Sequence, residues 1–128
     1  MNHQNLEILA NYLEVGDLKA GFDMSLYCEP HYFYQGTCGS YGCAAGHGPY
    51  AGIPKDSGET WHEYEIRVFD LNTPEWAWCF STRWATIDPT PLGAARRIRF
   101  LIRHPEKVND PALSQTRLIK ICNETQLY

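Results

Sequence analysis

The sequence predicts a mainly α protein of four or five helices with one long, glycine-rich ordered loop; an α+β variant with a small strand pair stays open. Several segments place apolar residues three and four positions apart, the period of an amphipathic helix. Two of these segments open on a Thr-Pro pair, a common helix start. The 128 residues include 13% aromatic side chains. We expect a single compact domain over residues 1–128.

Residues 3–15 are predicted to form the first helix. Asn2 can cap its start, and Gly16 follows its end, where glycine is common. The apolar residues of this segment have helical spacing: Leu6, Leu9, Tyr12 and Leu13. The residues that follow suggest a short strand through alternation: Phe22, Met24 and Leu26.

Residues 28–58 are predicted to form the long loop. Seven of the ten glycines fall between positions 36 and 58. Aromatic residues are threaded through the segment, so we expect it to be ordered against the core, with one helical turn near 42–47. A long ordered loop in a small domain is more often functional than merely connecting.

Residues 59–70 are predicted to form a helix with Trp61, Tyr64 and Val68 on one face. The alternation of Tyr64, Ile66 and Val68 also permits a strand. The next helix is expected to start with Thr73 as its N-cap and Pro74 at its first position. Its apolar side is formed by four residues at helical spacing: Trp76, Cys79, Phe80 and Trp84.

Thr90 and Pro91 open a further predicted helix, which we expect to end before Pro105, because the residue before a proline disfavours the helical region. Its apolar face is predicted to consist of Leu92, Ala95, Ile98, Leu101 and Ile102. A last helix is predicted to start at Asp110 and Pro111. Its inward residues would be Leu113, Leu118, Ile121 and Cys122.

Charge and cysteine content restrict the classes of function. The net charge is −4, with −8 in residues 1–82 and +4 in residues 83–128. This asymmetry indicates either a charged partner or packing of the two halves against each other. The number of cysteines, five, is odd, and the sequence shows neither a signal-peptide pattern nor an apolar run of membrane length. We therefore expect a cytoplasmic protein with reduced thiols and no membrane contact.

The stretch from Gln35 to Pro49, QGTCGSYGCAAGHGP, permits three interpretations. The first is a thiol-dependent enzyme that uses Cys43 or Cys38, with His47 or His62 near it. The start of the stretch partly resembles the papain-like pattern around the nucleophile, but Tyr41-Gly42 is inserted before the second cysteine and the chain is too short for that two-lobed fold.

The second interpretation is a structural zinc site with Cys38, Cys43 and His47 as ligands, completed by Cys28 or His31. The third, which we favour, is a metal-free structural turn in which Cys38 and Cys43 are reduced and Cys43 is buried. The glycines around Cys43 allow the backbone to pack closely on a bulky neighbour. We therefore expect no metal, no other cofactor and no catalytic residue, although the enzyme interpretation stays open.

Two motifs resemble those of a group of small uncharacterised proteins from bacteriophages and prophages. The first combines Cys-Gly-Thr-x-x-Cys-Ala-x-Gly-His with a later Trp…Phe…Trp, and the second is Asp-Asn-Thr-Pro-x-Gly-Ala-x-x-Arg-Ile. The likeness covers residues 22–103, with departures at Ser40 and Pro89. The matching residues are Cys38, Gly39, Cys43, Ala44, Gly46, His47, Trp78, Phe80, Trp84, Asp88, Thr90, Pro91, Gly93, Ala94, Arg97 and Ile98. The resemblance implies a phage context and a bacterial host cell, but no reaction.

From this context we expect an accessory protein that binds and inhibits or redirects a host protein or protein–nucleic-acid complex, as an anti-CRISPR protein does. The net charge argues against direct sequence-specific nucleic-acid binding. Aromatic and arginine side chains carry most of the energy of protein interfaces. The candidate partner-binding residues are Tyr32, Phe33, Tyr34, Tyr50, Arg96, Arg99 and Arg103. The partner's identity and the oligomeric state stay open.

Overall fold

The computed structural model describes residues 1–16, 21–22, 41–42, 44–81 and 83–125. The mainly α prediction is confirmed, since these residues form seven α-helices, two of which are single turns. The elements are α1 (His3–Val15), β1 (Gly21–Phe22), β2 (Tyr41–Gly42), the 3₁₀ turns η1 (Ala45–His47) and η2 (Pro49–Ala51), α2 (Trp61–Phe69), α3 (Thr73–Phe80), α4 (Trp84–Ile87), α5 (Pro91–Arg103), α6 (Pro105–Val108) and α7 (Gln115–Glu124).

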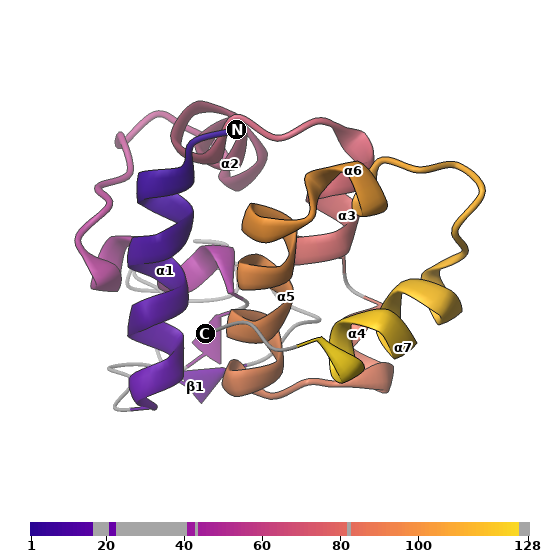
Figure 1. Ribbon diagram of the computed structural model, residues 1–128. Coiled ribbons are helices and arrows are strands. Elements are labelled where there is room, and N and C mark those ends of the chain that lie inside the picture. Colours follow the sequence, from indigo (N-terminus) through magenta and orange to yellow (C-terminus); the bar gives the residue numbers. More distant parts are fainter. Residues whose placement is uncertain (17–20, 23–40, 43, 82, 126–128) are drawn as a thin grey trace.

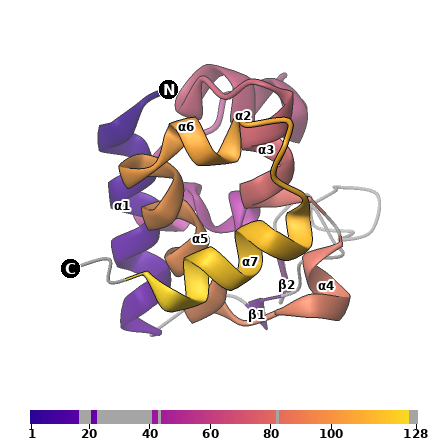
Figure 2. The same ribbon diagram turned by 45° about the vertical axis from the view of Figure 1, so that its right-hand side comes forward.

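Helix α5 lies at the centre of the arrangement. It runs beside α1 in the opposite direction and also contacts α3, α6 and α7 (Figures 1 and 2). Helix α2 packs on α1, and the start of α1 is tied to the end of α2 because the Asn5 side chain donates a hydrogen bond of 2.7 Å to the carbonyl oxygen of Val68. No helix among the described residues has the length and apolar content needed to cross a membrane.

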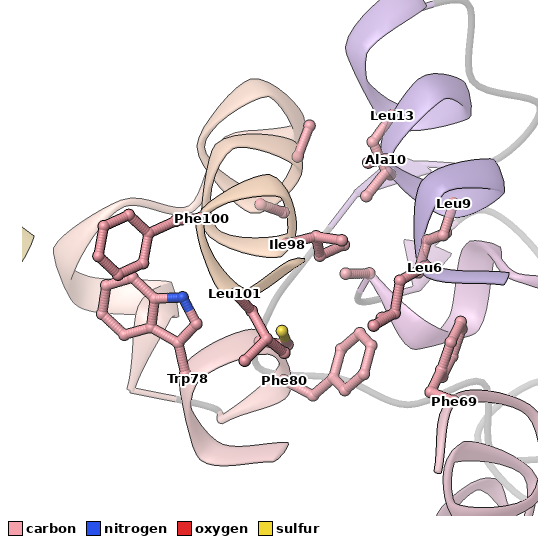
Figure 3. Close-up of a cluster of buried hydrophobic side chains, with 14 of the residues drawn as sticks. Leu6, Leu9, Ala10, Leu13, Phe69, Trp78, Phe80, Ile98, Phe100 and Leu101 are labelled. Atoms are coloured by element: carbon pink, nitrogen blue, oxygen red, sulfur yellow. The ribbon is translucent and has the colours of Figure 1, made fainter. Parts of the chain in front are cut away.

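The core fills the space between α1, α2, α3 and α5. Ile98 of α5 points toward Leu6 and Leu9 of α1, and Trp78 of α3 lies beside Phe100 of α5 (Figure 3). The Trp78 and Phe100 rings are 5.5 Å apart between centroids. The Trp78 indole N–H also donates a buried hydrogen bond of 2.9 Å to the carbonyl oxygen of Arg97, which fixes α3 to the middle of α5.

The helix at 3–15 forms as predicted, with Asn2 as its N-cap and Gly16 in the left-handed conformation at its end. The segment at 59–70 adopts its helical alternative, because Thr60 and Glu63 form a capping box at its start. The small strand pair consists of β1 and β2 in parallel, with Gly21 opposite Tyr41. Met24 and Leu26 lie outside the described residues.

Three predicted boundaries are wrong. The N-cap of α3 is Asn72, whose side-chain oxygen accepts from the backbone N–H of Glu75, so Thr73 is already helical. The helix then ends at Phe80, because Ser81 is extended, and Trp84 belongs to the separate turn α4. Helix α7 starts at Gln115 behind its Ser114 cap rather than at Asp110.

Two further expectations differ in detail. Pro105 ends α5 as predicted, but it also occupies the first position of α6, where its missing N–H is tolerated. Leu92 is 57% exposed rather than inward, because it shares the outer face of α5 with Arg96 and Arg99, four and seven positions further on. The helical turn expected near 42–47 is the 3₁₀ turn η1, and a second 3₁₀ turn, η2, follows it.

Tyr64 anchors the segment that follows η2 to helix α2. Its ring is fully buried, and its hydroxyl donates a hydrogen bond of 2.6 Å to the carbonyl oxygen of Ile53. A Tyr64→Phe substitution keeps the ring but leaves this buried carbonyl without its donor, so we expect the free energy of unfolding to fall by about 1–2 kcal/mol. Urea denaturation measures the change.

Tyr50→Phe is the matched control, since Tyr50 is only half-buried and η2 already orders its backbone. We expect this variant to stay within about 0.5 kcal/mol of the parent. Equal effects of the two substitutions would contradict an anchoring role for the Tyr64 hydroxyl.

Candidate functional site

The four arginines of helix α5 differ in their burial and in their contacts. Leu92, Arg96, Arg99 and Arg103 stand at i, i+4, i+7 and i+11, so they form one stripe along its outer face. We call these four residues the α5 stripe. Arg97 points about 100° away from Arg96 and lies on the buried side of the helix.

Arg99 is held by helix α1. Its Nε donates to the Glu14 carboxylate at 2.9 Å, and its Nη2 lies 2.7 Å from the same carboxylate and 2.5 Å from Asn11 Oδ1. Glu7 Oε1 is a further 3.7 Å from Nη1. The Arg99 side chain is only 13% exposed. Its charge is therefore largely neutralised by α1 and contributes little to the charge of the protein surface.

Arg96 and Arg103 are the members of the α5 stripe whose charges stay available. Arg103 is exposed and Arg96 is half-buried. Within the described part of the chain, neither guanidinium group has a hydrogen bond or an ion pair. Of the seven candidate partner-binding residues, these two and the half-buried Tyr50 are therefore placed with side chains that can contact a partner. Tyr32, Phe33 and Tyr34 lie outside the described residues.

Arg97 is 3% exposed, and its guanidinium group lies over an aromatic ring. Its guanidinium carbon is 4.1 Å from the centroid of the Trp84 ring. Its Nη1 donates to the backbone carbonyl oxygen of Asp88 at 3.3 Å and lies 3.7 Å from the Asp88 carboxylate. Burial lowers the pKa of Arg97 from its ordinary value, against the opposing effect of Asp88.

The other two nitrogens of Arg97, Nε and Nη2, are buried and have no hydrogen-bond partner among the described residues. Arg97 is one of the residues that line a cavity of about 180 Å³ between α3, α4, α5 and α7. Arg96 and the exposed Asn123 also line this cavity, which we call the Arg97 cavity. Sequence reasoning missed it because helical spacing places Arg97 beside the α5 stripe but does not reveal that Trp84 and Asp88 enclose it.

The second resemblance motif forms one structural unit at the start of α5. The Asp88 carboxylate accepts hydrogen bonds from the backbone N–H and the hydroxyl of Thr90, at 3.3 and 2.7 Å. The Thr90 hydroxyl in turn accepts from the backbone N–H of Gly93 at 3.0 Å. A Cβ atom at Gly93 would overlap the Asp88 carboxylate. Glycine at this position therefore leaves room for the Asp88 carboxylate, and Asp88 links this cap to Arg97.

The glycine-rich stretch is described only in part. Cys28, His31, Cys38 and Cys43 lie outside the described residues. His47 is fully buried, and its ring centroid is 6.2 and 6.1 Å from those of Tyr12 and Tyr50. In this position the imidazole is withdrawn from solvent. The choice between a structural turn, a zinc site and a reactive thiol at Cys43 stays a prediction.

Cys79 and Cys122 are both buried. Burial raises the pKa of the Cys79 thiol far above its usual range and that of Cys122 to about 11. Burial therefore disfavours the thiolate form of both residues, which makes them poor nucleophiles. No group of three or more His, Cys, Asp or Glu residues in the described ranges is placed to hold a metal ion.

We expect Gly93→Ala to have opposite effects on the free energy of unfolding in the presence and in the absence of the Asp88 carboxylate. Gly93→Ala should displace the Asp88 carboxylate and lower the free energy of unfolding by about 1 kcal/mol. In an Asp88→Ala background the same substitution should raise it by about 0.5–1 kcal/mol, because alanine is the better helix former. Thermal or urea denaturation of the four proteins gives both values. The same sign in both backgrounds would refute the steric explanation.

Arg99 and Arg103 form a matched pair on the α5 stripe. Arg99→Gln removes the contacts with α1 and should lower the free energy of unfolding by about 1–2 kcal/mol, since hydrogen bonds to charged groups are among the stronger ones. Arg103→Gln removes an exposed charge and should change it by less than about 0.5 kcal/mol. Urea denaturation tests this difference. A neutral Arg99→Gln would show that the α1 contacts do not support the fold.

Searches of protein-family models, of curated proteins and of solved structures found no match to this chain. Arg96 and Arg103 of the α5 stripe are two cationic groups of the described structure that stay available to another molecule.

Proposed function

We propose that the protein is a phage-encoded accessory protein that binds a host protein or protein–nucleic-acid complex and inhibits or redirects it. An anti-CRISPR protein or another inhibitor of host defence is the class that best fits this description. The motif resemblance supports the phage context. The single observation that supports a binding role is the α5 stripe, where Arg96 and Arg103 have no hydrogen bond or ion pair among the described residues and Leu92 is exposed at one end.

The chemistry of the α5 stripe favours an acidic protein surface as its partner. Arginine donates in a planar fork that matches carboxylates, and its methylene groups add apolar contact area. Leu92, 57% exposed, supplies an apolar contact at one end of the stripe. Residues 83–128 carry +4, so an acidic partner would be attracted to this half of the chain. A net charge of −4 disfavours general nucleic-acid binding.

A charge reversal tests the proposal. The immobilised wild-type protein should repeatedly capture the same host component from a bacterial lysate. An Arg96→Glu/Arg103→Glu variant should capture about tenfold less, because two favourable contacts become repulsive. The readout is quantitative mass spectrometry of the captured proteins.

The control variant carries the same change of net charge elsewhere. Arg117 and Lys120 are exposed on α7, and Arg117→Glu/Lys120→Glu should leave the capture unchanged. The captured component identifies the function to assay, for example restored plaque formation by a CRISPR-targeted phage in cells that express the protein. Failure to capture any host component would refute the binding role, and equal capture by all three proteins would refute the α5 stripe as its surface.

A further inference from the structure

A second cavity, of about 290 Å³, lies between α3, α6 and α7, which all pack on α5 (Figure 2). Helix α3 lines it with residues at i, i+3, i+4 and i+7, which share one face: Pro74, Ala77, Trp78 and Ser81. The other lining residues are Val108 of α6, Gln115 and Leu118 of α7, and Arg83, which precedes α4. We call this space the α3–α7 cavity. It stays open because Ala77 and Ser81 have small side chains.

The floor of the α3–α7 cavity is apolar and fixed in position. Trp78, Val108 and Leu118 line the cavity and are all buried. The Trp78 ring is held by the hydrogen bond of its indole N–H to Arg97 and by an edge-on contact with Trp84, at 5.3 Å between the ring centroids. An apolar group that covers this floor is removed from water, which favours binding.

The polar residues of the lining are grouped together. The backbone N–H of Arg83 donates to the Ser81 hydroxyl oxygen at 3.2 Å, and Arg83 Nη1 donates to Gln115 Oε1 at 2.9 Å. The other guanidinium nitrogens of Arg83 have no hydrogen bond or ion pair with the described residues. Arg83 is exposed, so another molecule can reach it from solvent. The cavity thus combines a polar end that carries a cation with an apolar floor.

The charge at the polar end restricts the class of ligand. Of the described residues that line the cavity, Arg83 alone is charged. A monoanion balances this charge, whereas a dianion would place an uncompensated negative charge beside the apolar floor. The planar guanidinium group matches the two oxygens of a carboxylate. The lining therefore favours a carboxylate that is attached to an apolar body.

The volume restricts the size of that body. About 290 Å³ lies at the lower end of the roughly 300–1,000 Å³ of small-molecule sites. This space suits one aromatic ring or a short branched chain and is too small for a folded segment of another protein. An aromatic ring could pack against the Trp78 indole, as aromatic pairs do in protein cores.

We propose that the α3–α7 cavity binds a small free carboxylic acid with an apolar body, such as an arylacetate or a branched short-chain acid. Arg83 receives the carboxylate at the polar end, and the apolar body covers Trp78, Val108 and Leu118. This assignment does not rest on the proposed function, since none of the residues that line the cavity belongs to the α5 stripe.

Nuclear magnetic resonance titrations test each part of the proposed ligand. The protein is titrated with phenylacetate, with uncharged phenylacetamide and with acetate, at neutral pH and constant ionic strength. We expect phenylacetate to shift the Trp78 indole N–H and Arg83 Nε–H signals until they saturate. Phenylacetamide lacks the charge and acetate lacks the apolar body, so each should bind about tenfold more weakly.

Variants assign the binding to the cavity. Arg83→Gln removes the cation at an exposed position, so the protein should fold and its affinity for phenylacetate should fall about tenfold, without a change for phenylacetamide. Arg117→Gln removes an exposed cation of α7 that does not line the cavity and should leave both affinities unchanged. Ala77→Phe fills the cavity from a half-buried position and should abolish the phenylacetate shifts in a folded protein.

Three results would overturn the assignment. The first is the absence of a saturable shift at Trp78 with phenylacetate. The second is equal affinity for phenylacetate and phenylacetamide, or an unchanged affinity in Arg83→Gln, because either would show that the cation takes no part. The third is tighter binding of phenyl phosphate or of an acetylated Gly-Phe dipeptide than of phenylacetate, which would refute a small free carboxylic acid as the ligand.

Discussion

The antiparallel packing of α5 against α1 is the constraint on which the rest of the structure depends. Ile98 enters the apolar surface of α1 from the middle of α5 (Figure 3), and Arg99 holds the polar side of the same contact through Glu14 and Asn11. With one side of α5 fixed in this way, α3, α6 and α7 pack on its remaining surface. The burial of Arg97 and the exposure of the α5 stripe both follow from the rotation of α5 about its own axis.

That rotation buries Arg97 where two of its nitrogens, Nε and Nη2, have no hydrogen-bond partner among the described residues. An unsatisfied buried donor costs about 1–3 kcal/mol, and more when the group is charged. Trp84 and Asp88 offset part of this cost for Arg97, but they use one face and one nitrogen of the group. A hydrophobic residue of similar volume is often equal or better for stability at such a position. Arg97 is thus a costly residue for the fold at this position, and its contacts with Trp84 and Asp88 offset that cost only in part.

The sequence was sufficient to predict the helices where local chemistry decides the outcome. Asn2 and Thr90 cap their helices through their own side chains as expected, and apolar spacing identified most residues of the buried faces. The errors have two sources. Asn72 caps α3 through a local capping box with Glu75, a signal that the Thr73-Pro74 pair obscured. The Arg97 cavity escaped prediction because α7 and α4, distant in sequence, close it together.

The uneven charge of the two halves also has a structural explanation. Arg99 is paired with Glu14 and Glu7, both in the acidic half, so part of the asymmetry reflects packing of the halves on each other. Arg97 is buried, and the exposed Arg83 donates to Gln115. Another molecule approaching α5 therefore meets far fewer free cations than residues 83–128 suggest. Two free arginines beside a leucine suit a limited acidic patch on a protein, whereas a nucleic-acid backbone would require a continuous cationic track.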